Sequence, residues 1–516
     1  MKIFKVNLFA ACFVIIISVH SQPALKIPDS YKYVKANLEF LASDELEGRE
    51  ATSKGEKLAS LFIAQELEKY GVKPFGDNGT YFQNFNMTVT GYHTQSNITI
   101  FDEIENPKTF INGEDIFYNP GLLANTEHKN IKTEIIFAGY GITSEEPYYD
   151  SYNNLDVKDK VVLILSDTPK KDGEEIFDKQ TIRKFSRSNA KAEIAKMNGA
   201  VGLILLPNEE ILKYWDLAKN WASSYSFKLE VEDTVSPKDI IPSVTLNEKS
   251  AQYLLYDELV SYDNLINLDT FMPKSFKLKK QISFNFEIFK ELRQTRNIIG
   301  LVEGTDQNLQ NEYVTLGAHY DHIGFKGEDI FNGADDNGSG TVTILEAARQ
   351  LSLNNFNKRP ILFFFYTGEE KGLKGSKYLA NYSPFVNDII CNINIDMVGR
   401  KSEDSIYCIG SDKLSTEMYD LVKDANSESS NFVLDYTFDE PNDPNRFYYR
   451  SDHVHYAMKG IPITFFYDYM QDDYHKPTDT ANKINFIKIS KMVNFIYTLT
   501  LKISNLDHKL IVDKKE

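Results

Sequence analysis

Cysteine is scarce in this chain of 516 residues, which contains only three. Cys12 falls near the N-terminus, so Cys391 and Cys408 are the two that a processed protein would keep. Two cysteines do not make the disulfide framework that stabilises small secreted domains. Both lie in apolar, strand-like stretches, and we expect them to be buried small hydrophobes rather than metal ligands. A single bridge between neighbouring strands stays open.

Basic charge is also in short supply. The 57 Lys and Arg residues stand against 74 Asp and Glu residues, which gives a formal net charge of −17 at pH 7. A surface of this sign argues against nucleic acid or an anionic membrane as a partner. The apolar content of 42% is ordinary for a soluble globular protein, and the length suffices for two or three domains.

An apolar run long enough to span a membrane is missing as well. The N-terminal run from Leu8 to Val19 covers 12 residues behind Lys2 and Lys5, and small residues close it at Val19-His-Ser21. This pattern predicts a signal peptide over residues 1–21. We therefore expect a secreted or periplasmic protein with no membrane insertion after cleavage. A lipid anchor on the cysteine within this run is disfavoured, because the apolar residues continue past it.

The predicted fold class is α/β, with a small α/β domain inserted into a larger one. Residues 22–115 open the larger domain with helical patterns, in which Ser53 and Glu56 have capping-box spacing. Residues 116–275 contain short apolar runs punctuated by glycine, hold no cluster of ligand-type residues, and form the expected insertion. Residues 276–510 then alternate strand and helix, which implies a central, mostly parallel sheet sandwiched by helices.

Side chains of metal-ligand type follow four predicted strands of this last domain. The strands and the residues behind them are Tyr313–Ala318 with His319, Pro360–Tyr366 with Glu369 and Glu370, Ile389–Ile395 with Asp396, and Ile461–Tyr467 with His475. Ligands collect outside the carboxyl ends of the strands in open α/β sheets, so we expect these side chains to converge. Asp336, in a glycine-flanked loop that runs into a helix, is expected to join them.

The residue types point to a pair of zinc ions. Zinc accepts imidazole nitrogen and carboxylate oxygen, and one carboxylate has an oxygen for each of two ions. We expect one ion to be held by His319, Asp396 and a shared Asp336, and the other by Glu370, His475 and the same Asp336. Manganese or cobalt could occupy the same atoms. Each motif alone is weak, but a chance origin would have to explain five of them at one sheet edge.

Three further residues complete the predicted chemistry. Glu369 neighbours a ligand and is the candidate base, which would take a proton from a metal-bound water and pass it to a leaving amine. The carboxylate of Asp321 could accept a hydrogen bond from the free ring nitrogen of His319 and fix its tautomer. The hydroxyl of Tyr474 could donate to a developing oxyanion.

Other polar and aromatic residues carry less weight. The loop around Asp336 lacks the ligand spacing of an EF-hand and the Lys-Ser/Thr of a phosphate-binding loop. His322, His453 and His455 are weaker candidates, and the Ser451-Asp-His453 stretch could equally be a helix cap or a pocket wall. The aromatic run Phe465–Tyr467 is expected to be core rather than a substrate box.

Together these motifs resemble the co-catalytic di-zinc exopeptidases, a family that includes bacterial secreted aminopeptidases and glutamate carboxypeptidase II. The resemblance covers about 285 to 505 and extends to Leu41-Ala-Ser-Asp-Glu-Leu-Glu-Gly-Arg49, which looks like the family's N-terminal signature. The insertion looks like a protease-associated domain. The resemblance implies the ligand set, base, second-sphere partner and oxyanion donor named above, all with the expected residue type. It also implies a cis peptide bond between Asp336 and Asn337, although some relatives carry Asp in place of Asn337.

The resulting hypothesis is an exported zinc aminopeptidase that acts on peptide substrates. A carboxypeptidase or a glutaminyl cyclase on the same scaffold is one alternative, and a non-enzymatic binding protein is the other. A carboxypeptidase should need a cationic pocket for the free carboxylate of its substrate. The only arginines near the motif segments are Arg400, Arg446 and Arg450, and they form no evident cluster.

Overall fold

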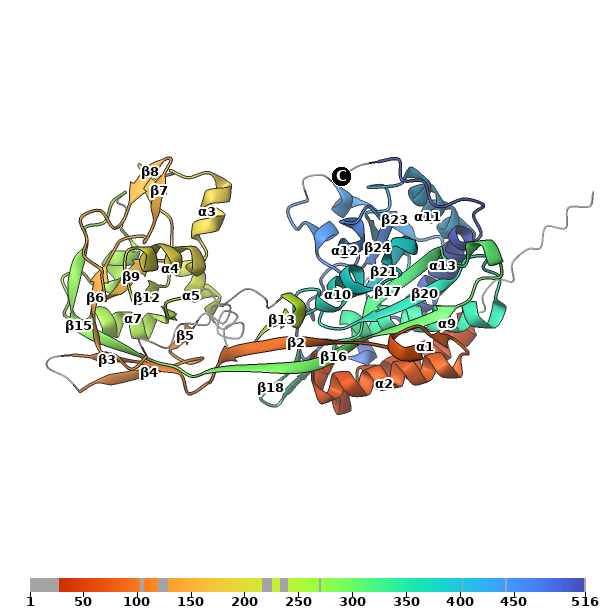
Figure 1. The fold of residues 1–516 in the computed structure, drawn as a ribbon, viewed down its shortest axis with the longest axis horizontal. Helices are drawn as coiled ribbons and strands as arrows, with labels where there is room; N and C mark the ends of the chain where they lie inside the picture. The colour runs from red at the N-terminus through yellow and green to blue at the C-terminus, as the bar shows by residue number, and fades with distance from the viewer. Residues whose placement is uncertain are drawn as a thin grey trace, which may run out of the picture.

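The computed structural model describes residues 27–102, 106–118, 129–215, 225–232, 240–268, 271–400, 402–440 and 443–514. The expected signal peptide over residues 1–21, including Cys12, lies outside them. Two lobes are joined by a ribbon of long strands (Figure 1). None of the described helices combines the length and the apolar character needed to cross a bilayer.

The larger lobe is built on a mixed sheet with the order β13-β2-β16-β20-β17-β21-β24-β22-β23, and β1 pairs with β16. The strands are β1 (Lys73–Pro74), β2 (Phe82–Tyr92), β13 (Ser226–Leu229), β16 (Ile288–Val302), β17 (Tyr313–His319), β20 (Ile361–Tyr366), β21 (Ile389–Asp396), β22 (Ser405–Ile409), β23 (Val433–Asp435) and β24 (Ile463–Tyr467). The α/β class is confirmed. The central strands β20, β17, β21 and β24 are parallel as expected, but β2 and β16 pair antiparallel with their neighbours, and β22 pairs antiparallel with β24 and parallel with β23.

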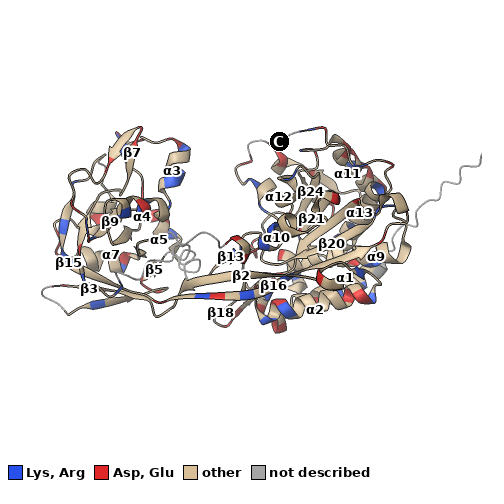
Figure 2. Ribbon diagram, viewed as in Figure 1, with Lys and Arg blue, Asp and Glu red and all other residues tan. Residues whose placement is uncertain are grey.

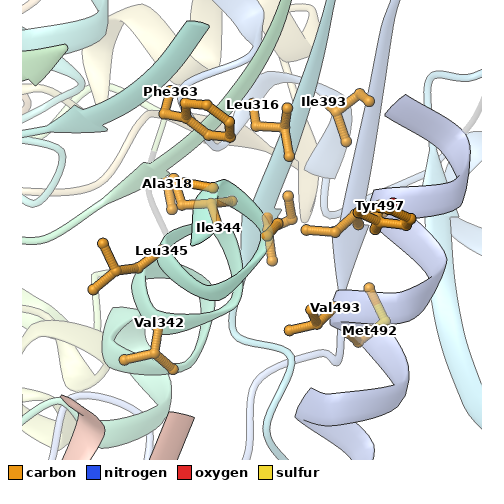
Figure 3. Packing of buried hydrophobic residues seen from close by; sticks show 14 of the residues in the cluster. Leu316, Ala318, Val342, Ile344, Leu345, Phe363, Ile393, Met492, Val493 and Tyr497 are labelled. Carbon is orange, nitrogen blue, oxygen red and sulfur yellow. The ribbon is translucent and has the colours of Figure 1, made fainter. Parts of the chain in front are cut away.

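Helices cover both faces of this sheet. They are α1 (Ile27–Leu41), α2 (Lys54–Lys69), α9 (Gly340–Asn354), α10 (Lys374–Tyr382), α11 (Thr416–Glu428), α12 (Val454–Ala457) and α13 (Phe486–Ser504). The first face packs on α1, α2, α9, α11 and α13, and the second on α10 and α12. Figure 3 shows Leu316, Phe363 and Ile393 of the strands against α9 and α13.

The run of apolar residues in β20 explains why both faces need helices. Phe363 and Phe365 enter the core under α9, whereas Leu362, Phe364 and Tyr366 enter the core under α10 and α12. Successive residues of a strand point to opposite faces, so a continuous apolar run requires burial on both sides. The same alternation buries Cys391 and Cys408, which are free thiols and form no bridge.

The start of α2 agrees only in part with the capping-box expectation. Ser53 Oγ accepts the backbone N–H of Glu56 at 3.1 Å, as the spacing predicts. The Glu56 carboxylate does not return to the Ser53 backbone. It is buried and accepts hydrogen bonds from the hydroxyls of Thr295 and Tyr320. The first helices are thereby tied to the residue that follows His319.

The smaller lobe has a second mixed sheet, ordered β4-β3-β15-β6-β9-β12-β14-β5. Its strands are β3 (Asn97–Phe101), β4 (Lys108–Ile111), β5 (Ile116–Tyr118), β6 (Thr133–Phe137), β9 (Val161–Leu165), β12 (Gly202–Leu206), β14 (Ser243–Leu246) and β15 (Phe276–Asn285). Helices α3 (Lys179–Phe185), α4 (Ser188–Met197), α5 (Glu209–Lys213), α7 (Glu248–Leu255) and α8 (Tyr262–Ile266) accompany it. The sheet extends beyond the expected bounds of 116–275, because β3, β4 and β15 belong to it.

Both lobes also contain short two-stranded sheets. They are β7 (Thr143–Glu145) with β8 (Tyr148–Asp150), β10 (Lys170–Lys171) with β11 (Glu174–Glu175), and β18 (Gly324–Lys326) with β19 (Asp329–Phe331). Blue and red segments are interspersed along the chain in Figure 2, and α2 carries both signs.

One strand of the inserted segment returns to the larger lobe. β13 pairs antiparallel with β2, with Ser226 opposite Thr90 and Leu229 opposite Met87, and forms the edge of the larger sheet. An ion pair of 2.6 Å between Glu232 and Lys377 of α10 reinforces the contact. The chain therefore links the lobes through β13 as well as through the β2–β16 ribbon.

Candidate metal centre

The carboxyl edge of the parallel strands brings the candidate ligands together. His319 and Asp396 are the last residues of β17 and β21, and Glu370 follows β20 by four positions. His475 lies in the segment after β24, and Asp336 lies in the π-helical turn Ala334–Ser339 ahead of α9. Four of these five side chains are nearly buried, and that of His475 is 35% exposed.

Asp336 lies between the two histidines. Its Oδ1 is 3.5 Å from Nε2 of His319, and its Oδ2 is 3.3 Å from Nε2 of His475. The two oxygens of one carboxylate therefore face two different imidazoles. This is the arrangement that a ligand shared by two ions requires.

The carboxylates of Asp396 and Glu370 complete two sets of candidate ligands. The first set is His319, Asp396 and Asp336, and the second is Glu370, His475 and Asp336. Oδ1 of Asp396 is 3.3 Å from Nε2 of His319, and Oε2 of Glu370 is 3.1 Å from Nε2 of His475. Ligand atoms about 2.0–2.2 Å from a tetrahedral zinc ion lie about 3.3–3.5 Å apart. The four separations of 3.1–3.5 Å are close to that spacing, and Nε2 of His475 has no hydrogen-bond partner within the described residues. The residues fit two zinc ions, one in each set.

His322 is a buried neighbour of the second set. It is fully buried, and its Nδ1 lies 2.8 Å from Oε1 of Glu370 and 3.9 Å from Oδ2 of Asp336. By proximity alone, His322, Asp336 and Glu370 also form a possible metal-binding group. We expect His475 to be the ligand, because its Nε2 lies 3.1–3.3 Å from oxygens of both carboxylates, whereas Nδ1 of His322 is close to Glu370 alone. The sequence signal for His322 was its place in the same loop as His319.

The charges of the site strongly shift the pKa values of its residues. Burial alone would lower the pKa of His319, but the carboxylates of Asp396, Glu369 and Asp336 outweigh it and raise the pKa well above the usual value. Burial raises the pKa of Glu369 well above the carboxyl range, and the carboxylates of Glu370 and Asp396 add to the shift. Bound cations would oppose this accumulation of negative charge. A buried carboxylate of raised pKa is suited to accept a proton near neutral pH.

Comparison with known proteins agrees with this geometry. The model of Peptidase family M28 matches residues 297–500. The chain carries a peptidase family M28 domain. The family resemblance drawn from the motifs is therefore confirmed. A probable leucine aminopeptidase of Trichophyton verrucosum is 31% identical over 218 residues, and leucine aminopeptidase 1 of Sclerotinia sclerotiorum is 30% identical over 217 residues.

These alignments cover only part of each protein. They include 39% and 38% of this chain, and the chain spans 57% and 53% of the two relatives. Two solved structures are similar over nearly the whole length. An aminopeptidase from Aneurinibacillus sp. strain AM-1 has a TM-score of 0.58 at 18% identity and covers 94% of this chain and 96% of its own. A zinc aminopeptidase from Bacillus subtilis has a TM-score of 0.56 at 20% identity, with coverage of 94% and 98%. At these identities the likeness shows the fold.

In the M28 domain the contact of Asp321 differs from the expected one. Its carboxylate oxygen lies 3.8 Å from Nδ1 of His319, whereas its backbone carbonyl lies 3.2 Å from that nitrogen and accepts the hydrogen bond. The carboxylate instead accepts the backbone N–H of Glu369 at 3.2 Å. Asp321 thus links the loop of a ligand to the loop of the candidate base. Burial raises the pKa of Asp321 to about 8.

Asn337, the residue after Asp336, has a structural role of its own. The Asp336–Asn337 bond is cis, as the family resemblance implies. The side chain of Asn337 donates to the carbonyl of Ile395 at 3.0 Å and accepts the N–H groups of Gly340 and Met397. A carboxylate at this position could not donate to that carbonyl. Asn337 therefore ties the loop of Asp336 to the end of β21, where Asp396 lies.

Two positioning contacts of the M28 domain escaped the sequence analysis. The carboxylate of Asp479 accepts the backbone N–H groups of Asp335 and Asp336 at 2.9–3.1 Å and pairs with Arg400 at 2.6 Å. Ser451 donates to Oδ2 of Asp396 at 2.8 Å. The signal for Asp479 was its place four residues after His475, in a stretch that stood out only for its histidine.

The N-terminal signature also contacts the loops that carry His319 and Asp336. Arg49 is buried, and its guanidinium donates to the carbonyls of Tyr320 at 2.8 Å, Asn332 at 2.7 Å and Gly333 at 3.0 Å, and also to that of Leu41. Tyr320 follows His319, and Gly333 starts the turn that carries Asp336. One side chain thus connects the loops of His319 and Asp336, two of the three candidate ligands of the first set.

Beyond the ligands the pocket has an aromatic wall. It is lined by Met397, Phe447, Arg450, Phe465, Tyr467 and Tyr474. The expectation that the aromatic run at 465–467 is only core is therefore wrong in part, because Phe465 and Tyr467 line the pocket while Phe466 packs under the opposite face. Buried His453 stacks on Phe465 with ring centres 4.6 Å apart, so it backs the wall. Tyr474 stacks on His475 at 3.9 Å.

Proposed function

We propose that this protein is an exported di-zinc aminopeptidase with Glu369 as its general base. The observation that carries the proposal is the position of Asp336, whose two oxygens face two separate pairs of ligand atoms. Its relatives by sequence bear the name leucine aminopeptidase, and its structural neighbours include a zinc aminopeptidase. Zinc would be held by His319 and Asp396 on one side, by Glu370 and His475 on the other, and by Asp336 between them.

The residues around this centre divide the work of peptide hydrolysis. Two bound zinc ions would polarise the scissile carbonyl and make a bound water more acidic. Glu369 would accept a proton from the attacking water and give it to the departing amine. The backbone N–H of Glu369 is fixed by Asp321, so the base is held in place from the loop of His319. Burial keeps the proton acceptor out of bulk water.

Tyr474 supplies the remaining donor. Burial raises the pKa of its hydroxyl above the usual value, and the carboxylates of Asp336 and Glu370 add to the shift. The phenol is therefore protonated at neutral pH and can donate to the oxygen that gains negative charge. Its ring is stacked on His475, which fixes the direction of the hydroxyl relative to the pocket. The side chain of the substrate's first residue would lie against the aromatic wall.

The inserted lobe has no part in this chemistry. We propose that it is a protease-associated-like domain, and that it shapes the approach to the pocket from its own side of the β2–β16 ribbon. Its mixed sheet with a parallel centre and flanking helices is compatible with that assignment.

One panel of substrates separates the candidate activities. Purified protein with zinc supplied is tested on leucyl p-nitroanilide, on an N-acetylated peptide, on a peptide with a blocked C-terminus and on glutaminyl peptides. We expect hydrolysis of the substrates with a free N-terminus and two zinc ions per chain by elemental analysis. Turnover of only the N-blocked peptide would indicate a carboxypeptidase, and cyclisation with one ion a glutaminyl cyclase. No reaction with any of them would support a binding protein.

A further inference from the structure

Apart from the acidic centre, the wall of the pocket contains a single charged side chain. Arg450 lines the pocket together with Phe447, Phe465 and Tyr467. Its guanidinium carbon lies 5.1 Å from the centre of the Phe447 ring. An arginine stacked on an aromatic face keeps its planar fork of donors free at the edge. The ring holds the cation beside the pocket.

No carboxylate neutralises this cation within the described part of the chain. Arg450 is exposed and takes part in no ion pair there, whereas Arg400 is paired with Asp479 at 2.6 Å and with Asp473 at 3.4 Å. Arg446 stacks on Tyr449 at 4.9 Å and does not line the pocket. Of the three arginines near the motif segments, one therefore presents unused donors to the substrate.

We propose that Arg450 binds a carboxylate of the substrate and so gives this peptidase a preference for substrates that carry a carboxylate. The inference rests on the proposed function. An aromatic wall accepts an apolar stem, and a guanidinium fork at its edge matches the two oxygens of a carboxylate. Lysine or arginine at the first position of a peptide would meet a like charge there. The carboxylate belongs either to an acidic side chain on the first residue or to the C-terminus of a short peptide.

Four substrates distinguish these two sources. Glutamyl and leucyl p-nitroanilide differ in a side-chain carboxylate, and Leu-Gly and Leu-Gly-amide differ in a C-terminal carboxylate. kcat/KM is measured for each with the zinc-loaded wild type and with Arg450→Gln, Arg450→Lys and Arg446→Gln. Arg446→Gln is the matched control, because it removes an arginine stacked on a neighbouring ring outside the pocket. Zinc content and Tm verify that each variant is folded and loaded.

The expected result is a change of selectivity. A hydrogen-bonded charge pair is worth about tenfold or more in binding. Arg450→Gln should lower the ratio of acidic to neutral kcat/KM by about tenfold in one of the two substrate pairs, and that pair identifies the source of the carboxylate. Arg450→Lys should restore part of the ratio, and Arg446→Gln should leave it unchanged. Equal losses on all four substrates, or no loss, would overturn the inference while wild-type activity leaves the proposed function standing. A wild type inactive on all four would overturn both.

Discussion

The two lobes have similar sheets and different edges. In the smaller lobe β6, β9, β12 and β14 run parallel, as β20, β17, β21 and β24 do in the larger lobe. Behind the strands of the smaller lobe, however, Asn208 caps α5 and Asn247 caps α7 with their side-chain oxygens. The polar groups at that edge are used by the fold. In the larger lobe they face one another across a pocket, so a shared sheet architecture does not by itself create a site.

Both lobes use a buried cation to hold loops through backbone carbonyls. In the smaller lobe the ammonium of Lys191 donates to the carbonyls of Leu165, Ser166 and Asp167 at 2.7–3.0 Å. These carbonyls lie at the end of a single strand, β9. In the larger lobe Arg49 reaches two separate ligand loops. The same kind of contact holds one turn in the first case and connects two loops of the candidate metal site in the second.

Removal of the candidate base gives the largest expected difference between the lobes. Glu369→Gln keeps the shape of the side chain and removes the proton acceptor, so kcat should fall about 100- to 10,000-fold with zinc content near normal. Asp167→Asn changes a carboxylate behind β9 of the smaller lobe and should leave kcat unaltered. Steady-state kinetics with elemental analysis measures both. Turnover retained by Glu369→Gln would reject the base.

Loss of the shared ligand should affect both ions. Asp336→Ala removes the oxygens that face His319 and His475, and both sets then lack a ligand. We expect zinc content to fall from two ions per chain to less than one, whereas His475→Ala should weaken the binding of one ion. Equilibrium dialysis against zinc, followed by elemental analysis, measures the stoichiometry. If Asp336→Ala kept two tightly bound ions, the sharing would be ruled out.

The two buried cations provide a third contrast. Arg49→Met frees the loops behind His319 and Asp336, and removal of supporting contacts of a metal site costs about 10- to 100-fold in affinity. Lys191→Met should lower the Tm and leave zinc affinity as in the wild type. Competition with a chromogenic chelator measures affinity, and calorimetry measures Tm. Equal zinc affinity in both variants would show that Arg49 only stabilises the fold.

A fall in pH should lower the stability of the larger lobe before that of the smaller one. His453 donates from Nε2 to the carbonyl of Tyr448 at 2.8 Å, its Nδ1 is buried, and burial lowers its pKa to about 4. A neutral folded form is favoured above the unfolded pKa of about 6.5, so this stability is lost as the pH falls from about 6.5 through 4. The loss amounts to about 2 kcal/mol at pH 5. His453→Gln, which can still donate to that carbonyl, should remove this contribution, while that of His455, whose pKa burial also lowers to about 4, remains.

Two spectroscopic signals separate the lobes in that experiment. Both tryptophans of the chain, Trp215 and Trp221, belong to the inserted segment. The ring of Trp215 lies 5.2 Å from that of Phe117 of β5 in the smaller lobe. In a Trp221→Phe background, tryptophan fluorescence therefore follows the smaller lobe, and release of zinc follows the larger one. Urea titrations at pH 7 and pH 5 should show a shift of the zinc signal that His453→Gln reduces. An unchanged shift in the variant would assign the acid sensitivity to other groups.

The sequence was sufficient where function depends on residue type at a strand end. The candidate ligands His319, Asp396 and Glu370 were identifiable because apolar runs define the strands and these residues follow within four positions. Contacts to backbone atoms left no such trace. Arg49 binds carbonyls more than 270 positions away, and a carbonyl has the same chemistry in every residue.

Strand partners were also beyond reach of the pattern. Alternation and apolar runs predict strands but not their neighbours, so the antiparallel pairing of β2 and β16 and the assignment of β3, β4 and β15 to the smaller lobe required coordinates. His322 was underrated for a related reason. Its distance from Glu370 depends on how two loops fold over each other, and a spacing of three residues from His319 does not reveal it.

The strand β13 has a consequence for attempts to shorten this protein. Phe227 packs with Phe85 and Val89 of β2, and the ammonium of Lys371, directly after Glu370, lies 5.0 Å above its ring. Excision of the inserted segment as a block would thus strip an edge from the catalytic sheet and uncover the neighbour of a ligand. A minimal peptidase would have to retain residues 226–229 or replace them with a strand of its own.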